Sequence, residues 1–182
     1  TSSTDNHQQK FHLISSRCLM ALHAIIKSLA SKRLSNDRKV FEELSQNLIS
    51  MVSQFGFFYI QKCIVDKVGE SPSITGGFTS IELQEHSFCL DQAILCIKIL
   101  HKLVLHGFKD NVENNALNHL IINLLQSFNQ LITKYNRIVT SVDQTLVDFF
   151  KEKYSYLIVL YIQVLTDYQD TYPFDFVNTC MS

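Results

Sequence analysis

The segment 29–44 constrains the fold most, because it has the pattern of an elbow between two long amphipathic helices. Lys32 and Arg33 suit the negative dipole end of the helix that precedes them. Ser35 or Asn36 suits the N-cap of the helix that follows, and acidic residues come in its early turns. Elbows between long helices are the building units of stacked helical proteins, so this segment predicts an all-α fold.

Composition agrees with a helical protein. Glycine and proline are scarce, with 5 and 2 residues in a chain of 182, whereas all-β proteins need turn residues every ~8–12 positions. Hydrophobic residues make up 46% of the chain, which excludes intrinsic disorder. The formal net charge is −1, so no overall charge attracts the chain to nucleic acid or to an anionic membrane.

Apolar residues recur at spacings of three and four along the chain. The spacing predicts helices over 8–31, 37–67, 81–106, 113–135 and 142–168. Their expected inward positions are, in order, Phe11, Ile14, Cys18, Leu22, Ile25 and Leu29; Phe41, Leu44, Leu48, Met51, Phe55, Tyr59 and Cys63; Phe88, Ala93, Cys96, Leu100, Leu103 and Val104; Leu117, Leu120, Leu124, Phe128, Leu131 and Tyr135; and Leu146, Phe150, Tyr154, Leu157, Tyr161, Val164 and Tyr168.

Two interruptions are expected. Gly56 lies within the second helix, and we expect a bend or break next to it. The segment 69–80 carries one proline and three glycines, which predicts a flexible loop between the second and third helices.

Two architectures suit long helices in antiparallel order: a closed bundle, or an open stack of helix pairs. Residues such as Val104, Leu105, Ile158 and Val159 widen the apolar arcs of the third and fifth helices beyond one seam. A helix with neighbours on two sides has this pattern. We therefore expect residues 1–182 to form a single stack of antiparallel, HEAT-like helix pairs.

No motif for catalysis, a cofactor or a metal is present. His101 and His106 are five residues apart, which places them on different sides of a helix, and no H-E-x-x-H pattern occurs. The five cysteines are odd in number and lack CxxC spacing, and most lie in apolar runs, where cysteine acts as a small hydrophobic residue. We expect a protein that is not an enzyme.

Four cations at the elbow are the candidate binding residues. The helix dipole explains Lys32 and Arg33, but Arg38 and Lys39 oppose the dipole of the helix that they begin. Local pairing and solubility are one interpretation of these two. The other is a partner-binding role for all four, with an acidic protein as the partner.

Three segments, 28–45, 97–108 and 165–176, resemble the importin-β (karyopherin-β) superfamily of nuclear transport receptors. They carry the strings Ser-Lys-Arg-Leu and Asp-Arg-Lys, then Lys-x-Leu-x-Lys-Leu-x-x-x-Gly-Phe, then Tyr-Pro-Phe-Asp-Phe. The resemblance implies an internal fragment from the N-terminal third of a longer superhelix, with about two and a half HEAT repeats.

The resemblance also implies a function. Members of the superfamily bind cargo proteins, the GTPase Ran in its GTP form, and phenylalanine-glycine nucleoporins, and they shuttle between cytoplasm and nucleus. Membranes, nucleic acids and cofactors are not expected partners. Two alternatives stay open: a helical-repeat scaffold or adaptor outside transport, and a helical-bundle enzyme, which would need a buried polar cluster.

A fragment is expected to expose apolar surface at both of its ends. The first helix, and the C-terminal end around Phe174, Phe176 and Val177, should expose apolar residues that missing neighbours would cover. Dimers through these ends would follow.

Overall fold

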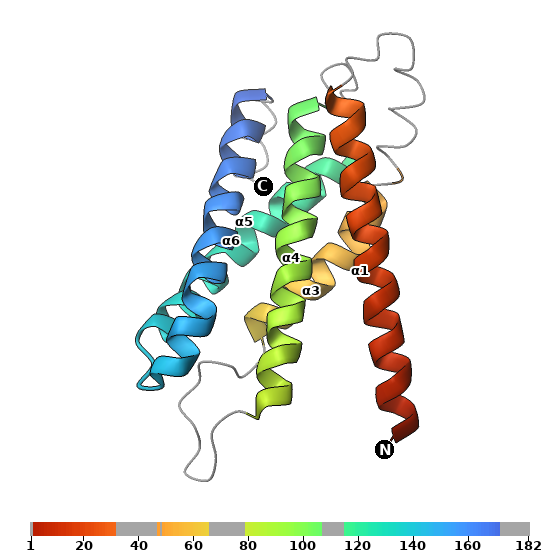
Figure 1. The fold of residues 1–182 in the computed structure, drawn as a ribbon. Coiled ribbons are helices and arrows are strands. Elements are labelled where there is room, and N and C mark those ends of the chain that lie inside the picture. The colour runs from red at the N-terminus through yellow and green to blue at the C-terminus, as the bar shows by residue number, and fades with distance from the viewer. Residues whose placement is uncertain (1, 32–46, 48, 66–78, 107–114, 172–182) are drawn as a thin grey trace.

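The computed structural model describes residues 2–31, 47, 49–65, 79–106 and 115–171, and helices are the only regular elements in these ranges (Figure 1). The expected all-α fold class is confirmed. The elements are α1 (Ser2–Ser31), the π-helical turn η1 (Val52–Gly56), α3 (Phe57–Val65), α4 (Ser80–His106), α5 (Asn115–Val139) and α6 (Gln144–Thr171).

Helices α1, α4 and α6 form one layer and run in the same direction. Helix α4 lies between α1 on one side and α6 on the other (Figure 1). The contacts across α4 and α6 show the direction, because His86 pairs with Tyr154 and, further along both helices, His101 pairs with Asp167. We call this the parallel layer.

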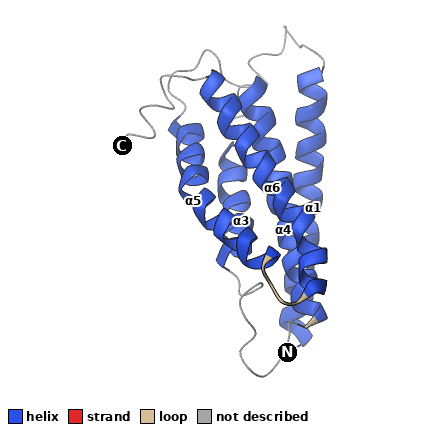
Figure 2. Cartoon of the chain, turned by 90° about the vertical axis from the view of Figure 1, so that its left-hand side faces the viewer, coloured by secondary structure: helices blue, strands red, loops and turns tan. Residues whose placement is uncertain are grey.

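Helices α3 and α5 lie in a second layer behind the first (Figure 2). Helix α5 is antiparallel to α6, since Tyr161 contacts Ser127 whereas the later Tyr168 contacts the earlier Asn118. Helix α3 is antiparallel to α4, because Lys62 bonds to Glu85 while Gly56, just before α3, lies against Cys96. Antiparallel pairs stacked with their second helices in register form the expected HEAT-like array.

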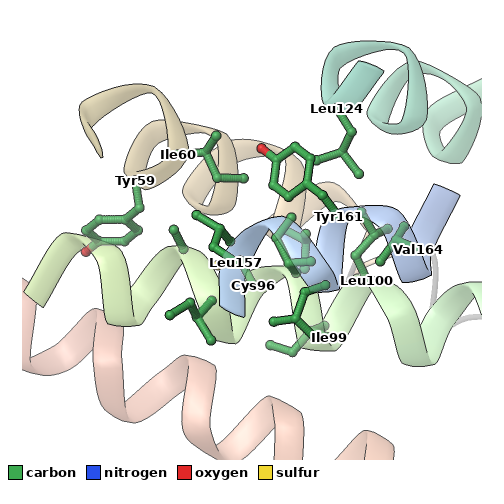
Figure 3. Close-up of a cluster of buried hydrophobic side chains, with 14 of the residues drawn as sticks. Tyr59, Ile60, Cys96, Ile99, Leu100, Leu124, Leu157, Tyr161 and Val164 are labelled. Carbon is green, nitrogen blue, oxygen red and sulfur yellow. The ribbon is translucent and has the colours of Figure 1, made fainter. Parts of the chain in front are cut away.

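Helix α4 is the centre of the core. It packs against α1, α3 and α6, and its buried side chains include Ala93, Cys96, Leu100, Leu103 and Val104, as expected. Figure 3 shows Cys96 and Leu100 within the core. The wide apolar arc of α4 therefore comes from neighbours on two sides and behind.

The inward face of α6 is the prediction that succeeds at every position. All seven expected residues are buried, and three of them are tyrosines spaced by seven residues: Tyr154, Tyr161 and Tyr168. Each hydroxyl bonds to the second layer: Tyr154 to the Cys63 carbonyl at 2.8 Å, Tyr161 to Ser127 at 3.3 Å and Tyr168 to Asn118. Burial raises the pKa of Tyr161 well above its usual value, so this hydroxyl stays neutral.

The predicted inward face of α1 is wrong at three positions, although Leu22 packs against the core as expected. Leu19 and Ile26 are buried, whereas Ile14 and Ile25 are 61% and 45% exposed, and Cys18 is exposed. The true inward face includes polar side chains that find partners across the interface. Ser16 accepts a hydrogen bond from Gln92, and the His12 ring nitrogen lies 3.5 Å from the Tyr59 hydroxyl. Because these positions are polar, the hydropathy pattern of α1 does not reveal its inward face.

The expected interruption at Gly56 is confirmed and takes the form of the π-helical turn η1. A Cβ atom on Gly56 would lie 3.0 Å from the Cys96 Cβ, so the absent side chain lets η1 approach α4. The extra residue in a π-turn also shifts the phase of the helix. Ile49 before the turn and Val52, its first residue, are therefore buried, whereas the expected Met51 and Phe55 are half-buried.

Two helix starts have side-chain caps. Thr79 and Glu82 form a capping box, in which Glu82 accepts from the Thr79 N–H at 2.8 Å and the Glu82 N–H donates to the Thr79 hydroxyl at 3.2 Å. Asp143 caps α6 by accepting from the N–H groups of Thr145 and Leu146. Of the expected loop 69–80, Ser80 is the first residue of α4, and 69–78 lie outside the described residues.

Replacing Thr79 by alanine is expected to lower the free energy of unfolding by about 1 kcal/mol, because the Glu82 N–H in the first turn of α4 loses its acceptor, the Thr79 hydroxyl. Urea denaturation followed by circular dichroism measures the loss. Ser80→Ala is the matched control, one residue inside the helix, and should change stability by much less. Equal effects of the two variants would show that the box does not stabilise α4.

Candidate protein-binding surfaces

The four elbow cations Lys32, Arg33, Arg38 and Lys39 lie outside the described residues, so their role stays a prediction. The C-terminal apolar group around Phe174 lies outside them as well. The candidate surfaces below are therefore built from the helices.

A groove of about 360 Å³ lies between α3 and α5. Its lining is one aromatic ring and a set of polar side chains, four of them amides: Phe57, Gln61, Asn123, Gln126, Ser127 and Gln130. Amide side chains both donate and accept hydrogen bonds. Such a groove can pair with the main chain of an extended peptide while the Phe57 ring contacts an apolar side chain.

The sequence analysis missed this groove, although a signal was present. Asn123, Gln126 and Gln130 recur at spacings of three and four, which places them on one side of α5. Phe57 and Gln61 have the same relation on α3. Polar stripes of this kind also occur on solvated faces, so only the approach of the two helices distinguishes a groove.

The seam between α4 and α6 is tied by polar contacts on the outer side of the parallel layer. Lys153 donates to Ser87 at 2.8 Å and forms an ion pair with Asp91 at 2.7 Å. His101 pairs with Asp167 further along. Between these contacts the Lys98 ammonium lies 4.9 Å from the centroid of the Tyr156 ring.

Helices α1 and α6 expose large apolar side chains, as the first was expected to do. On α1 these are Leu13, Ile14, Met20 and Ile25, and on α6 they are Phe149, Tyr156, Val159 and Ile162. These two helices are the edges of the parallel layer. Of the arc that the sequence assigned to burial on α6, Ile158 is half-buried and Val159 is 48% exposed.

The described cysteines differ in their surroundings. Cys18 is exposed, contrary to its expected inward position, whereas Cys63, Cys89 and Cys96 are buried, as expected for small apolar residues. Burial raises the pKa of Cys96 to about 12, because the thiolate would lack solvation. Within the described ranges no group of three or more His, Cys, Asp or Glu side chains is arranged to hold a metal ion.

Alkylation of the native protein is expected to modify Cys18 before the buried Cys63, Cys89 and Cys96, and to leave Cys96 unmodified even at about pH 9, since thiolates are the reactive species. Peptide mass spectrometry after a timed iodoacetamide pulse measures the order. In denaturant every thiol should react at a similar rate. Rapid modification of Cys96 in the native protein would contradict its burial between α4 and the elements that pack against α4.

Comparison with known proteins shows a similarity in sequence to importin-11. The chain is 23% identical over 160 residues to importin-11 of Homo sapiens and 22% identical over 160 residues to importin-11 of Mus musculus. The chain is similar to importin-11. The match covers 88% of the chain but only 15% of each relative, so the chain spans a small part of their length.

Other comparisons add no further relative. No known protein-family profile matches the chain, and no solved structure matches it. The similarity to importin-11 is therefore one of sequence. None of the helices in the described residues is both long and apolar enough to cross a membrane.

Proposed function

We propose that this chain is a segment of a nuclear transport receptor, which binds cargo proteins under the control of Ran-GTP and shuttles between cytoplasm and nucleus. The observation that carries the proposal is the importin-11 match, which runs along 88% of the chain. The stack of helix pairs supports it, because such arrays present long surfaces to protein partners.

The mechanism would be binding, without catalysis. Helix α4 packs on α1, α3 and α6, so a small tilt of one pair moves its neighbours. Tilts that add along a superhelix change the shape of its binding surface, and a partner at one place alters affinity at another. The polar seam between α4 and α6 is where one pair would slide against the next.

The groove between α3 and α5 is the proposed contact for phenylalanine-glycine segments of nucleoporins. Phe57 offers a ring for an aromatic side chain, and the amides of Gln61, Asn123, Gln126 and Gln130 suit a glycine-containing main chain. Contacts of this size give weak binding, which fits rapid passage through a pore.

The full-length parent protein tests the transport function. Immobilised parent should retain Ran loaded with a non-hydrolysable GTP analogue and should not retain Ran-GDP. Failure to bind either form would contradict the proposal and would leave the scaffold alternative, which uses the same surfaces without Ran. A Gln126→Ala/Gln130→Ala variant should bind Ran normally and lose binding to a phenylalanine-glycine peptide.

A further inference from the structure

The outer side of the parallel layer carries a compact group of cations, formed by Lys27 of α1 and by Lys98 and Lys102 of α4 around His23. The hydrogen bond between Ser16 and Gln92 sets the register of α1 on α4, and seven residues further along, this register places His23 between Lys98 and Lys102. We call these four residues the basic cluster.

The environment of His23 shows that the side chains of the cluster lie close together. The pKa of His23 is lowered, first by burial and then by the positive charges of Lys98, Lys27 and Lys102. Among the residues that the structure describes, no carboxylate raises the pKa of His23 against these charges. By contrast, the pKa of His12, three turns earlier on α1, is lowered by burial and Lys62 but is raised in part by Glu85.

Two carboxylates on the seam between α4 and α6 already have partners of their own. Asp91 pairs with Lys153 at 2.7 Å, and Asp167 pairs with His101. Among the described residues, none of the three cluster lysines forms an ion pair with a carboxylate. Three cations that repel one another without compensation leave an excess positive potential on this surface.

Apolar and aromatic groups border the cluster. Tyr156 of α6 lies under the Lys98 ammonium and is 44% exposed, and Leu105 at the end of α4 is 38% exposed. Cations mixed with partly exposed aromatic and aliphatic side chains are typical of protein interfaces. Nucleic-acid binding relies on many phosphate contacts, whereas this chain has a net charge of −1 and offers one small cluster.

We propose that the basic cluster is a docking surface for an acidic segment of a protein partner. Carboxylates of the segment pair with Lys27, Lys98 and Lys102, and its apolar residues contact Tyr156. The docking surface adds the chemistry of one partner to the proposed function. It rests on that function only because it requires a protein as the ligand.

A fluorescein-labelled glutamate-rich peptide tests the proposal by fluorescence anisotropy with the full chain. Lys98→Glu/Lys102→Glu should weaken binding at least about tenfold, because attraction becomes repulsion. The matched control Lys10→Glu/Lys151→Glu changes net charge equally at exposed positions outside the cluster and should bind within about twofold of the unaltered chain. Circular dichroism and melting curves check that both variants fold.

A second measurement uses His23 itself. Bound carboxylates favour the imidazolium, so the pKa of His23 should rise when the peptide is added, as followed by NMR. Lys98→Arg/Lys102→Arg keeps the charges and should keep both the affinity and this rise.

Several results would overturn the proposal: no peptide binding by the unaltered chain, equal losses in the cluster and control variants, or binding of a single-stranded oligonucleotide more tightly than the peptide at the same lysines. The transport function fails separately. Peptide binding as expected with no Ran-GTP binding by the parent would refute the transport function alone, and Ran-GTP binding with unaffected cluster variants would refute the docking surface alone.

Discussion

Gly56→Ala is expected to lower the free energy of unfolding by about 1–3 kcal/mol, although alanine is the better helix former. The added methyl group would lie 3.0 Å from the Cys96 Cβ and 3.3 Å from its Sγ. Cys96 is fully buried on α4, the central helix, so it has no room to move aside. Either η1 retreats from α4 or the core repacks with strain.

Urea denaturation of Gly56→Ala measures this loss, and Gln54→Ala is the matched control because Gln54 is an exposed residue of the same π-turn. The double variant with Cys96→Gly removes both close contacts and should recover part of the stability, apart from the cost of a glycine in α4. A Gly56→Ala protein more stable than the parent would contradict the close approach of η1 and α4.

Tyr154→Phe is expected to cost about 1–3 kcal/mol, whereas Tyr161→Phe should cost about 0.5–1 kcal/mol. The Tyr154 hydroxyl donates to the Cys63 carbonyl at 2.8 Å and so accepts from the His86 Nε2–H at 2.8 Å. Its loss removes a partner from two buried polar groups on α3 and α4 together.

Tyr161 provides the matched comparison. Its hydroxyl contacts Ser127 at 3.3 Å, but Ser127 keeps its bond to the Leu124 carbonyl at 3.0 Å when the tyrosine is removed. Both tyrosines are fully buried and come from the same face of α6. Equal costs for the two variants would show that the hydrogen bonds of Tyr154 to α3 and α4 contribute no more than the single contact of Tyr161 with Ser127.

The fold could be predicted where a helix face is uniformly apolar. The seven inward residues of α6 were all found from spacing, because no polar residue interrupts that face. The inward face of α1 was missed because Ser16 and His12 belong to it and are satisfied by contacts with other helices. Sequence periodicity records hydropathy and does not record a partner across an interface.

The turn at Gly56 shows a second limit. A glycine within a long helix predicted an interruption, and η1 is that interruption. The kind of interruption set which residues are buried within it: a π-turn adds one residue to the turn, so the buried positions moved from the expected Met51 and Phe55 to Val52 and Gly56. One local change of geometry thus altered the buried face of the helix at Gly56.

The basic cluster is the feature that could be predicted least from the sequence. Lys98 and Lys102 are visible as neighbours on one helix, but Lys27 and His23 join them only because α1 packs alongside α4. The elbow cations, which the sequence singled out, lie outside the described residues, and their role stays a prediction. Long-range juxtaposition of charges is the information that one sequence lacks.

The transport proposal depends on an open stack, in which α4 separates α1 from α6. Paired spin labels test this directly, with one on the exposed native Cys18 of α1 and one on Gln163→Cys of α6, in a chain with Cys180→Ser. The stack predicts two interhelical spacings, or about 20 Å between the two helix axes before the label arms are added. A distance matching a single spacing of about 10 Å would mean that α1 and α6 are adjacent in a closed bundle, and it would contradict the account.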